Sequence, residues 1–144
     1  MDYDVTDTTH LATVAADMAA FATRKVSNEG IRLPLALPDG TPSDRYLVVR
    51  NYRCDAYRAK LNQIRDRIAE HGKASDAQHE ADRVALISSL ISGWNFEMPC
   101  TPENVAAFLA EAQLVAEQVD RVAMEDERFF GKGSTPSSDG SKVN

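Results

Sequence analysis

The side chains that could do covalent or acid–base chemistry are scattered along this sequence. Its histidines are His10, His71 and His79, and the last two are eight residues apart across a predicted helix break, which is not a zinc-binding spacing. Cys54 and Cys100 form no ligand pair, and no histidine lies near Cys54 in the sequence to activate it as a nucleophile. No phosphate-binding loop, dinucleotide fingerprint or calcium loop occurs. The sequence therefore predicts no catalytic, cofactor-binding or metal-binding residue, and we expect a protein that is not an enzyme.

Four aromatic residues are the candidates for binding a partner instead. Trp94 and Phe96 are the largest apolar anchors in the chain, and aromatic side chains dominate both protein cores and interface hot spots. For this pair we favour the core. Phe129 and Phe130 end the last predicted helix, where they either hold that helix on the body or form an exposed patch for a partner. The sequence supports these two roles equally.

Composition and charge exclude several classes of protein. The chain has 144 residues and a formal net charge of −6, which argues against nonspecific binding to nucleic acid. No apolar run approaches the roughly 20 residues needed to span a bilayer, and the acidic start of the chain does not resemble a secretion signal. Two separated cysteines are typical of reduced thiols in a cytosolic protein. We therefore expect a cytoplasmic protein without nucleic-acid or membrane partners.

Charge is unevenly distributed along the chain. Residues 50–73 hold seven Lys or Arg against three Asp or Glu, whereas residues 101–130 hold two against seven. The two segments could face each other within one fold or between subunits, or they could steer a partner. They could equally be two ordinary solvated helix faces.

Hydrophobic spacing in the first third of the chain changes from helical to alternating. Residues 8–25 are predicted to form a helix, with Leu11, Val14 and Met18 on its apolar face. Apolar residues then occupy every second position from Ile31 to Leu37, which predicts a strand, and its prolines place it at a sheet edge. A Pro-Asp-Gly turn and a second apolar run at 46–49 complete a predicted β-hairpin.

Helical spacing returns after the hairpin. Residues 53–71 carry an apolar stripe of Tyr57, Leu61, Ile64 and Ile68. A capping box from Ser75 to Gln78 begins a helix predicted to run to about Gly93. Thr101-Pro102-Glu103 begins a further helical region, continuous or kinked, that reaches Phe130. The polar residues 131–144 are predicted to be a disordered tail.

The predicted fold is thus α+β and mainly helical. It consists of a small β-hairpin near the N-terminal third, a bundle of three to four helices and a disordered C-terminal tail. Residues 1–130 are expected to form one globular domain, since this length is typical of a single domain and no internal repeat or second boundary is evident.

A particular order of motifs runs through these elements. Residues 35–49 begin Leu-Ala-Leu-Pro-Asp-Gly and end Leu-Val-Val, and residues 51–58 read Asn-Tyr-Arg-Cys-Asp-Ala-Tyr-Arg. Residues 86–96 end in Gly-Trp-Asn-Phe, residues 100–105 read Cys-Thr-Pro-Glu-Asn-Val, and Phe129-Phe130 follows an acidic helix. In order and spacing, these motifs resemble those of the tail assembly chaperones of siphophages and related prophages. Relatives often carry Asp-Ser in place of Cys54-Asp55, and proline at Gln113.

The resemblance implies a function without catalysis. Such a chaperone binds the long helical tape-measure protein, keeps it soluble and helps recruit tail-tube subunits around it. It would act in the cytoplasm of the infected bacterial host, and would be absent from the mature virion; further copies of the chain are another possible partner. The alternatives are a minor tail or head–tail joining protein that stays in the virion, and a phage regulator that binds a bacterial enzyme.

Overall fold

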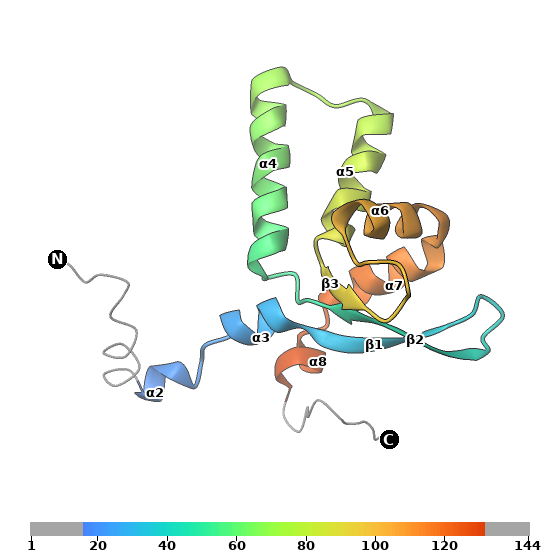
Figure 1. Ribbon diagram of the computed structural model, residues 1–144. Helices are drawn as coiled ribbons and strands as arrows, with labels where there is room; N and C mark the ends of the chain where they lie inside the picture. Colours follow the sequence, from blue (N-terminus) through green and yellow to red (C-terminus); the bar gives the residue numbers. More distant parts are fainter. Residues whose placement is uncertain (1–15, 132–144) are drawn as a thin grey trace.

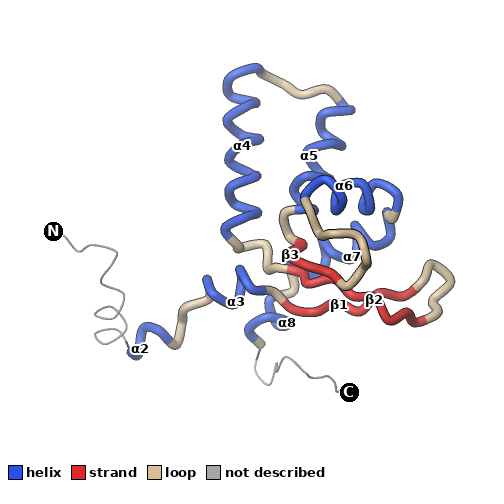
Figure 2. Tube along the Cα trace, in the orientation of Figure 1, coloured by secondary structure: helices blue, strands red, loops and turns tan. Residues whose placement is uncertain are grey.

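The computed structural model describes residues 16–131, and its fold is α+β and mostly helical (Figure 1). The predicted fold class is therefore confirmed. Figure 2 shows that the strands form one small sheet, and most of the described helices follow its first two strands in the chain. The first part of the predicted helix at 8–25, and all of the predicted tail except Gly131, lie outside the described residues.

Three antiparallel strands form the sheet, in the order β1-β2-β3. Strands β1 (Ile31–Ala36) and β2 (Pro42–Val49) are the predicted hairpin. β1 lies at the edge, as its prolines predicted, because a strand with a missing N–H is tolerated there. The third strand, β3 (Ile91–Trp94), pairs with β2 on its other side.

The third strand corrects one prediction from the sequence. The helix expected to continue to about Gly93 is α5 (Asp76–Ser88), which ends before β3 begins. At the helix end the Ser89 hydroxyl donates to the carbonyl of Leu86. Ile91 then pairs with Val49, so that pairing with β2 takes over from helical hydrogen bonding. Helical spacing could not reveal this strand, because four residues are too few to show a period of two.

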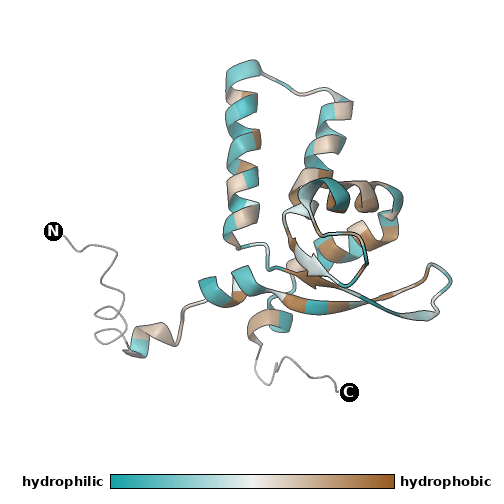
Figure 3. Ribbon diagram, viewed as in Figure 1, coloured by the Kyte–Doolittle hydropathy of each residue, from teal (hydrophilic) through white to brown (hydrophobic). Residues whose placement is uncertain are grey.

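One face of the sheet is buried beneath helices. Leu33, Leu35, Leu47 and Val49 are buried on this face, and Leu33 is opposite Leu47, which is in turn opposite Trp94. The helices α6 (Pro102–Glu111) and α7 (Gln113–Ala123) contribute buried residues to the same core. Figure 3 shows apolar residues concentrated where the strands meet these two helices.

The chain breaks between α6 and α7 at Ala112, whose backbone is not helical (φ −103°, ψ 69°). The sequence left open whether this region was continuous or kinked, and it is kinked although Gln113 is not proline. At the start of α6 the Thr101 hydroxyl accepts a hydrogen bond from the Asn104 N–H, so the predicted cap is confirmed. A short α8 (Asp126–Phe130) ends the described chain.

Helix α4 (Asp55–His71) extends away from the rest of the fold, and α5 brings the chain back toward it (Figure 1). Gly72 ends α4 and Ser75 caps α5, as predicted. However, the side chain of Gln78 donates to Asp82 rather than accepting from the Ser75 backbone N–H, so only half of the capping box forms. No residue of α4 is buried. Its predicted apolar stripe is therefore covered only in part.

The N-terminal helix prediction is wrong within the described residues. Instead of one helix reaching residue 25, the structure has α2 (Ala16–Ala19), a turn, and α3 (Arg24–Glu29). The amide of Phe21 donates to the carbonyl of Met18, which forms the turn. α3 forms where it can be anchored to the body, because Ser27 is fully buried there. Gly30 ends it with φ +84°, a conformation that favours glycine.

Candidate binding groove

An open apolar groove of about 650 Å³ lies between the β-hairpin and the corner where α6 meets α7. It exists because the hairpin extends beyond the helices that cover the rest of the sheet (Figure 1). Its apolar lining comes from both sides and includes Leu35, Leu37, Phe96, Phe108, Leu114 and Val115. A volume of this size is within the range of sites that take small ligands or the side chains of a partner.

The hairpin forms one wall of the groove and is internally braced. The amide of Leu37 donates to Thr41 and that of Gly40 donates to Leu37, which closes the turn. The Asp39 carboxylate accepts from the Thr41 amide, and the Ser43 hydroxyl donates to Leu35. Leu37 is nevertheless 52% exposed, because no helix lies over this end of the hairpin. The wall is thus ordered and still presents apolar surface.

The α6–α7 corner forms the opposite wall. Because the chain turns at Ala112, Leu114 lies in the first turn of α7 and points away from the core, and the residue is 65% exposed. Val115 lines the groove beside it and packs against the core. Glu111 and Gln118 add polar groups to the lining. The corner thus faces the hairpin with one strongly exposed leucine and a polar rim.

Aromatic rings support the groove from behind. Phe96 and Phe108 both line it, and their ring centroids are 5.1 Å apart. Trp94 contacts both rings edge-on, at 5.1 Å from Phe96 and 5.8 Å from Phe108. Its indole N–H donates to the carbonyl of Met98 at 2.7 Å. Edge-to-face packing of this kind adds stability beyond the area it buries, and here it fixes the position of Phe96.

Arg45 is the basic residue of the groove lining, and its guanidinium lies over the ring of Phe96. The Arg45 guanidinium is 5.6 Å from the centroid of Phe96 and donates to the carbonyl of Asn95. Asn95 in turn accepts from the amide of Tyr46 and donates to the carbonyl of Asp44. The strand β2 and the loop after β3 are therefore tied together at the groove, which favours a preformed binding surface.

The four aromatic residues predicted from the sequence lie in two separate clusters. Trp94 and Phe96 are half-buried against the core, and of the four only Phe96 lines the groove. Phe129 is buried and Phe130 half-buried in α8, which contacts α3, and their rings are 6.0 Å apart. This geometry fits the role of holding the last helix on the body.

Of the four residues predicted to bind a partner, only Phe96 lines the groove, and Leu114 is the exposed apolar lining residue on the helix side that sequence reasoning missed. Leu114 falls outside the apolar stripe of the C-terminal helices, so the stripe predicts neither a core position nor a site for it. A large apolar residue off the stripe of an otherwise amphipathic helix is the signal that could have identified it.

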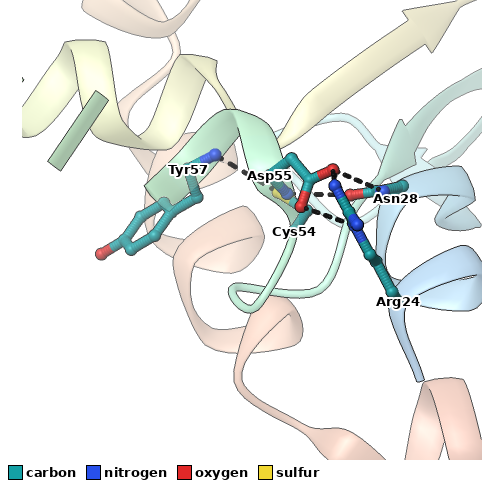
Figure 4. A network of polar contacts seen from close by, with 5 residues as sticks. All are labelled: Arg24, Asn28, Cys54, Asp55 and Tyr57. Carbon is teal, nitrogen blue, oxygen red and sulfur yellow. Dashed lines mark hydrogen bonds and ion pairs between the residues drawn. The ribbon is translucent and has the colours of Figure 1, made fainter. Parts of the chain in front are cut away.

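The motif at residues 51–58 is a structural junction rather than part of the groove. Cys54 is fully buried and caps α4, since its sulfur accepts from the Tyr57 amide at 3.4 Å. Asp55 accepts from Arg24 and Asn28 of α3, and the bond from Arg24 holds the pKa of that carboxyl below its ordinary value (Figure 4). The Cys54 sulfur thus lies away from solvent and serves as a helix cap.

Asn51 connects three parts of the chain at the same junction. Its amide donates to the carbonyl of Ala123 and to Asp126, and its oxygen accepts from the Ser27 hydroxyl and the Arg53 amide. The residue is fully buried. It therefore holds α3, the start of α4 and the α7–α8 connection in one arrangement.

Residues 16–131 contain no group of three or more His, Cys, Asp or Glu side chains placed to hold a metal ion. His10 lies outside them. Across the same residues, no helix is both long and apolar enough to cross a membrane. Neither a model of a known protein family, nor a curated protein, nor a solved structure matches this chain.

Proposed function

We propose that this protein is a phage tail assembly chaperone that holds apolar helical segments of the tape-measure protein in the groove between the β-hairpin and the α6–α7 corner. The observation that carries the proposal is the groove itself, whose two walls expose Leu37 and Leu114. Exposed apolar surface gathered in a concave site is typical of a protein-binding surface. The resemblance in motif order, given above, supplies the identity of the partner.

A helix with apolar residues on one face suits this groove. Helix-in-groove recognition inserts side chains three or four residues apart between two apolar walls. Here the walls come from a strand on one side and a helix start on the other, and the aromatic rings of Phe96 and Phe108 form the surface between them. Client helices that would otherwise aggregate could thus bury their apolar face against the chaperone.

Charged side chains in the groove would also discriminate between client helices. Arg45 and Glu111 both line it. A client helix with an acidic residue near Arg45 and a basic residue near Glu111 would be favoured over one with the opposite arrangement, because complementary charges select orientation.

Co-expression with the tape-measure protein encoded beside this gene tests the proposal. We expect the tape-measure protein to be soluble and to co-purify only with the wild-type chain, and to lose co-purification with Leu114→Glu. Met124→Glu is the matched control, because Met124 is also an exposed apolar residue (52%) but does not line the groove. A tape-measure protein that is soluble alone, with nothing co-purifying, would overturn the proposal. Detection of this chain in purified virions would favour the alternative, a retained minor tail or head–tail joining protein.

A further inference from the structure

Helix α4 is anchored to the rest of the fold at its first turn. The Asp55 carboxylate accepts hydrogen bonds from Arg24 and Asn28 of α3. The apolar residues of α4 that pack against the core are Ala56 and Tyr57, which also belong to this turn. Figure 1 shows the following turns extending away from the sheet. The helix is therefore held firmly at its N-terminal end.

The outer part of α4, residues 58–71, has much weaker apolar contacts. Leu61 and Ile64 are only half-buried, and Ile68 is 37% exposed. The helices α5, α6 and α7 each bury at least two residues, whereas α4 buries none. A segment with few buried apolar contacts has low local stability, and can open while the rest of a protein stays folded.

An ion pair that is largely shielded from solvent fixes this outer part to α5. The Asp82 carboxylate accepts from the Arg67 guanidinium and from Gln78, each at 3.0 Å. The side chain of Asp82 is only 12% exposed, so water screens the pair less than it screens a surface pair. Among the described residues, this is the one ion pair that joins α4 to α5. The pair therefore stabilises the closed position of the outer helix.

Once detached from α5, the outer part of α4 would lose its helical structure. Residues 58–71 are about as long as the roughly 12–15 residues below which an isolated helix is marginal in water. Most of the stability of such a helix comes from the surface against which it packs. Detachment would therefore expose the backbone N–H groups of this segment to solvent.

We propose that the outer part of α4 opens as a separate unit while the sheet, α6 and α7 stay folded, and that the Arg67–Asp82 pair holds it closed. Opening would uncover Leu61, Ile64 and Ile68, together with the surface of α5 that α4 contacts. In the proposed function, this would be an apolar surface available to client segments in addition to the groove. The opening itself does not depend on that function, because it is a property of the chain alone.

Hydrogen exchange of single amides in the full wild-type chain, followed by NMR where exchange reports the opening equilibrium, tests the proposal. We expect the amides of residues 58–71 to exchange faster than those of β2 and α7. Low concentrations of denaturant should change their exchange little and accelerate that of β2 steeply, because a local opening exposes less surface than global unfolding. Equal protection of α4 and β2, with the same dependence on denaturant, would overturn the proposal.

A substitution in the core separates local opening from global unfolding. Val119 is fully buried in α7, and its contacts would persist when α4 opens. Val119→Ala should therefore accelerate exchange in β2 at least about tenfold and leave residues 58–71 unchanged. The same acceleration in both segments would show that α4 opens only when the whole chain unfolds.

A substitution of the ion pair tests what holds the segment closed. Asp82→Asn should accelerate exchange of residues 58–71 about tenfold, because the pair with Arg67 exists only in the closed form. Glu80→Gln is the matched control, since it also removes a carboxylate from α5, and Glu80 pairs with Arg83 of the same helix. Exchange in residues 58–71 should be unchanged in this control. An effect of Asp82→Asn no larger than that of Glu80→Gln would refute the role of the pair.

Discussion

Replacing Asn51 by alanine should destabilise the protein more than most single substitutions. The amide is fully buried and makes four hydrogen bonds. Two of its partners keep another bond, since Ala123 still accepts from the Tyr52 amide and Asp126 from Arg53. The other two, the Ser27 hydroxyl and the Arg53 amide, lose the only acceptor described for them. At about 1–3 kcal/mol for each of these two polar groups left without a partner, the free energy of unfolding should fall by about 2–6 kcal/mol.

Chemical denaturation followed by circular dichroism measures this loss. Asn62→Ala is the matched control, because Asn62 is exposed on α4 and should change the free energy of unfolding by less than about 0.5 kcal/mol. Ser27→Ala alone should cost less than Asn51→Ala, since the Asn51 oxygen still accepts from Arg53.

Combining Ser27→Ala with Asn51→Ala closes a double-mutant cycle. Because the two side chains are bonded to each other, the combined loss should be smaller than the sum by about 1 kcal/mol. A loss below about 1 kcal/mol for Asn51→Ala, or strictly additive effects, would refute the idea that this buried amide holds α3 and α8 to the start of α4.

Four further predictions follow from other contacts. Trp94→Ala should lower the free energy of unfolding by about 2–4 kcal/mol in a denaturant titration, since it removes two ring contacts, and an unchanged melting temperature with lost client binding would contradict this. Leu114→Ser should weaken binding of a client helix about 5- to 30-fold by calorimetry while stability changes little, because burying the exposed part of a leucine contributes about 1–2 kcal/mol. Gly30→Ala should lower the melting temperature far more than Gly72→Ala. Both glycines have positive φ, but only at Gly30 would the added Cβ clash with backbone, since it would lie 2.5 Å from the Val49 carbonyl oxygen. Hydrogen bonds from Arg67 lower the pKa of Asp82 below its ordinary value of 3.8. The stability that this pair contributes is therefore present above pH 3.8 and is lost as the pH falls through the lowered pKa. Asp82→Asn should flatten that part of an acid-unfolding curve.

The sequence predicts the local elements of this fold well where the signal lies in side-chain chemistry. The Pro-Asp-Gly turn, the Thr101 cap and the break at Gly72 form as expected, because each depends on a few adjacent residues. The edge position of β1 agrees with the prediction from its prolines, of which Pro34 lies within the strand.

Elements that are stabilised by contacts with distant parts of the chain cannot be predicted from local sequence patterns. β3 is a strand because Ile91 and Trp94 pair with β2, more than 40 residues earlier in the chain. α3 ends where Gly30 approaches Val49, and α2 separates from it although alanines favour a continuous helix. The groove could not be predicted either, since it is formed by a hairpin and a helix corner whose relative position only the fold determines.

The proline in β1 has a consequence for how the protein behaves beside other chains. An exposed strand edge offers free backbone groups to any extended segment, and is a route to aggregation. In β1, Pro34 removes one donor and the register shifts between Pro34 and Ala36. Together they leave no long regular run of hydrogen-bonding groups for an incoming strand. A protein that stays beside unfolded, aggregation-prone segments could thus contact them through side chains without its own sheet becoming a template for their growth.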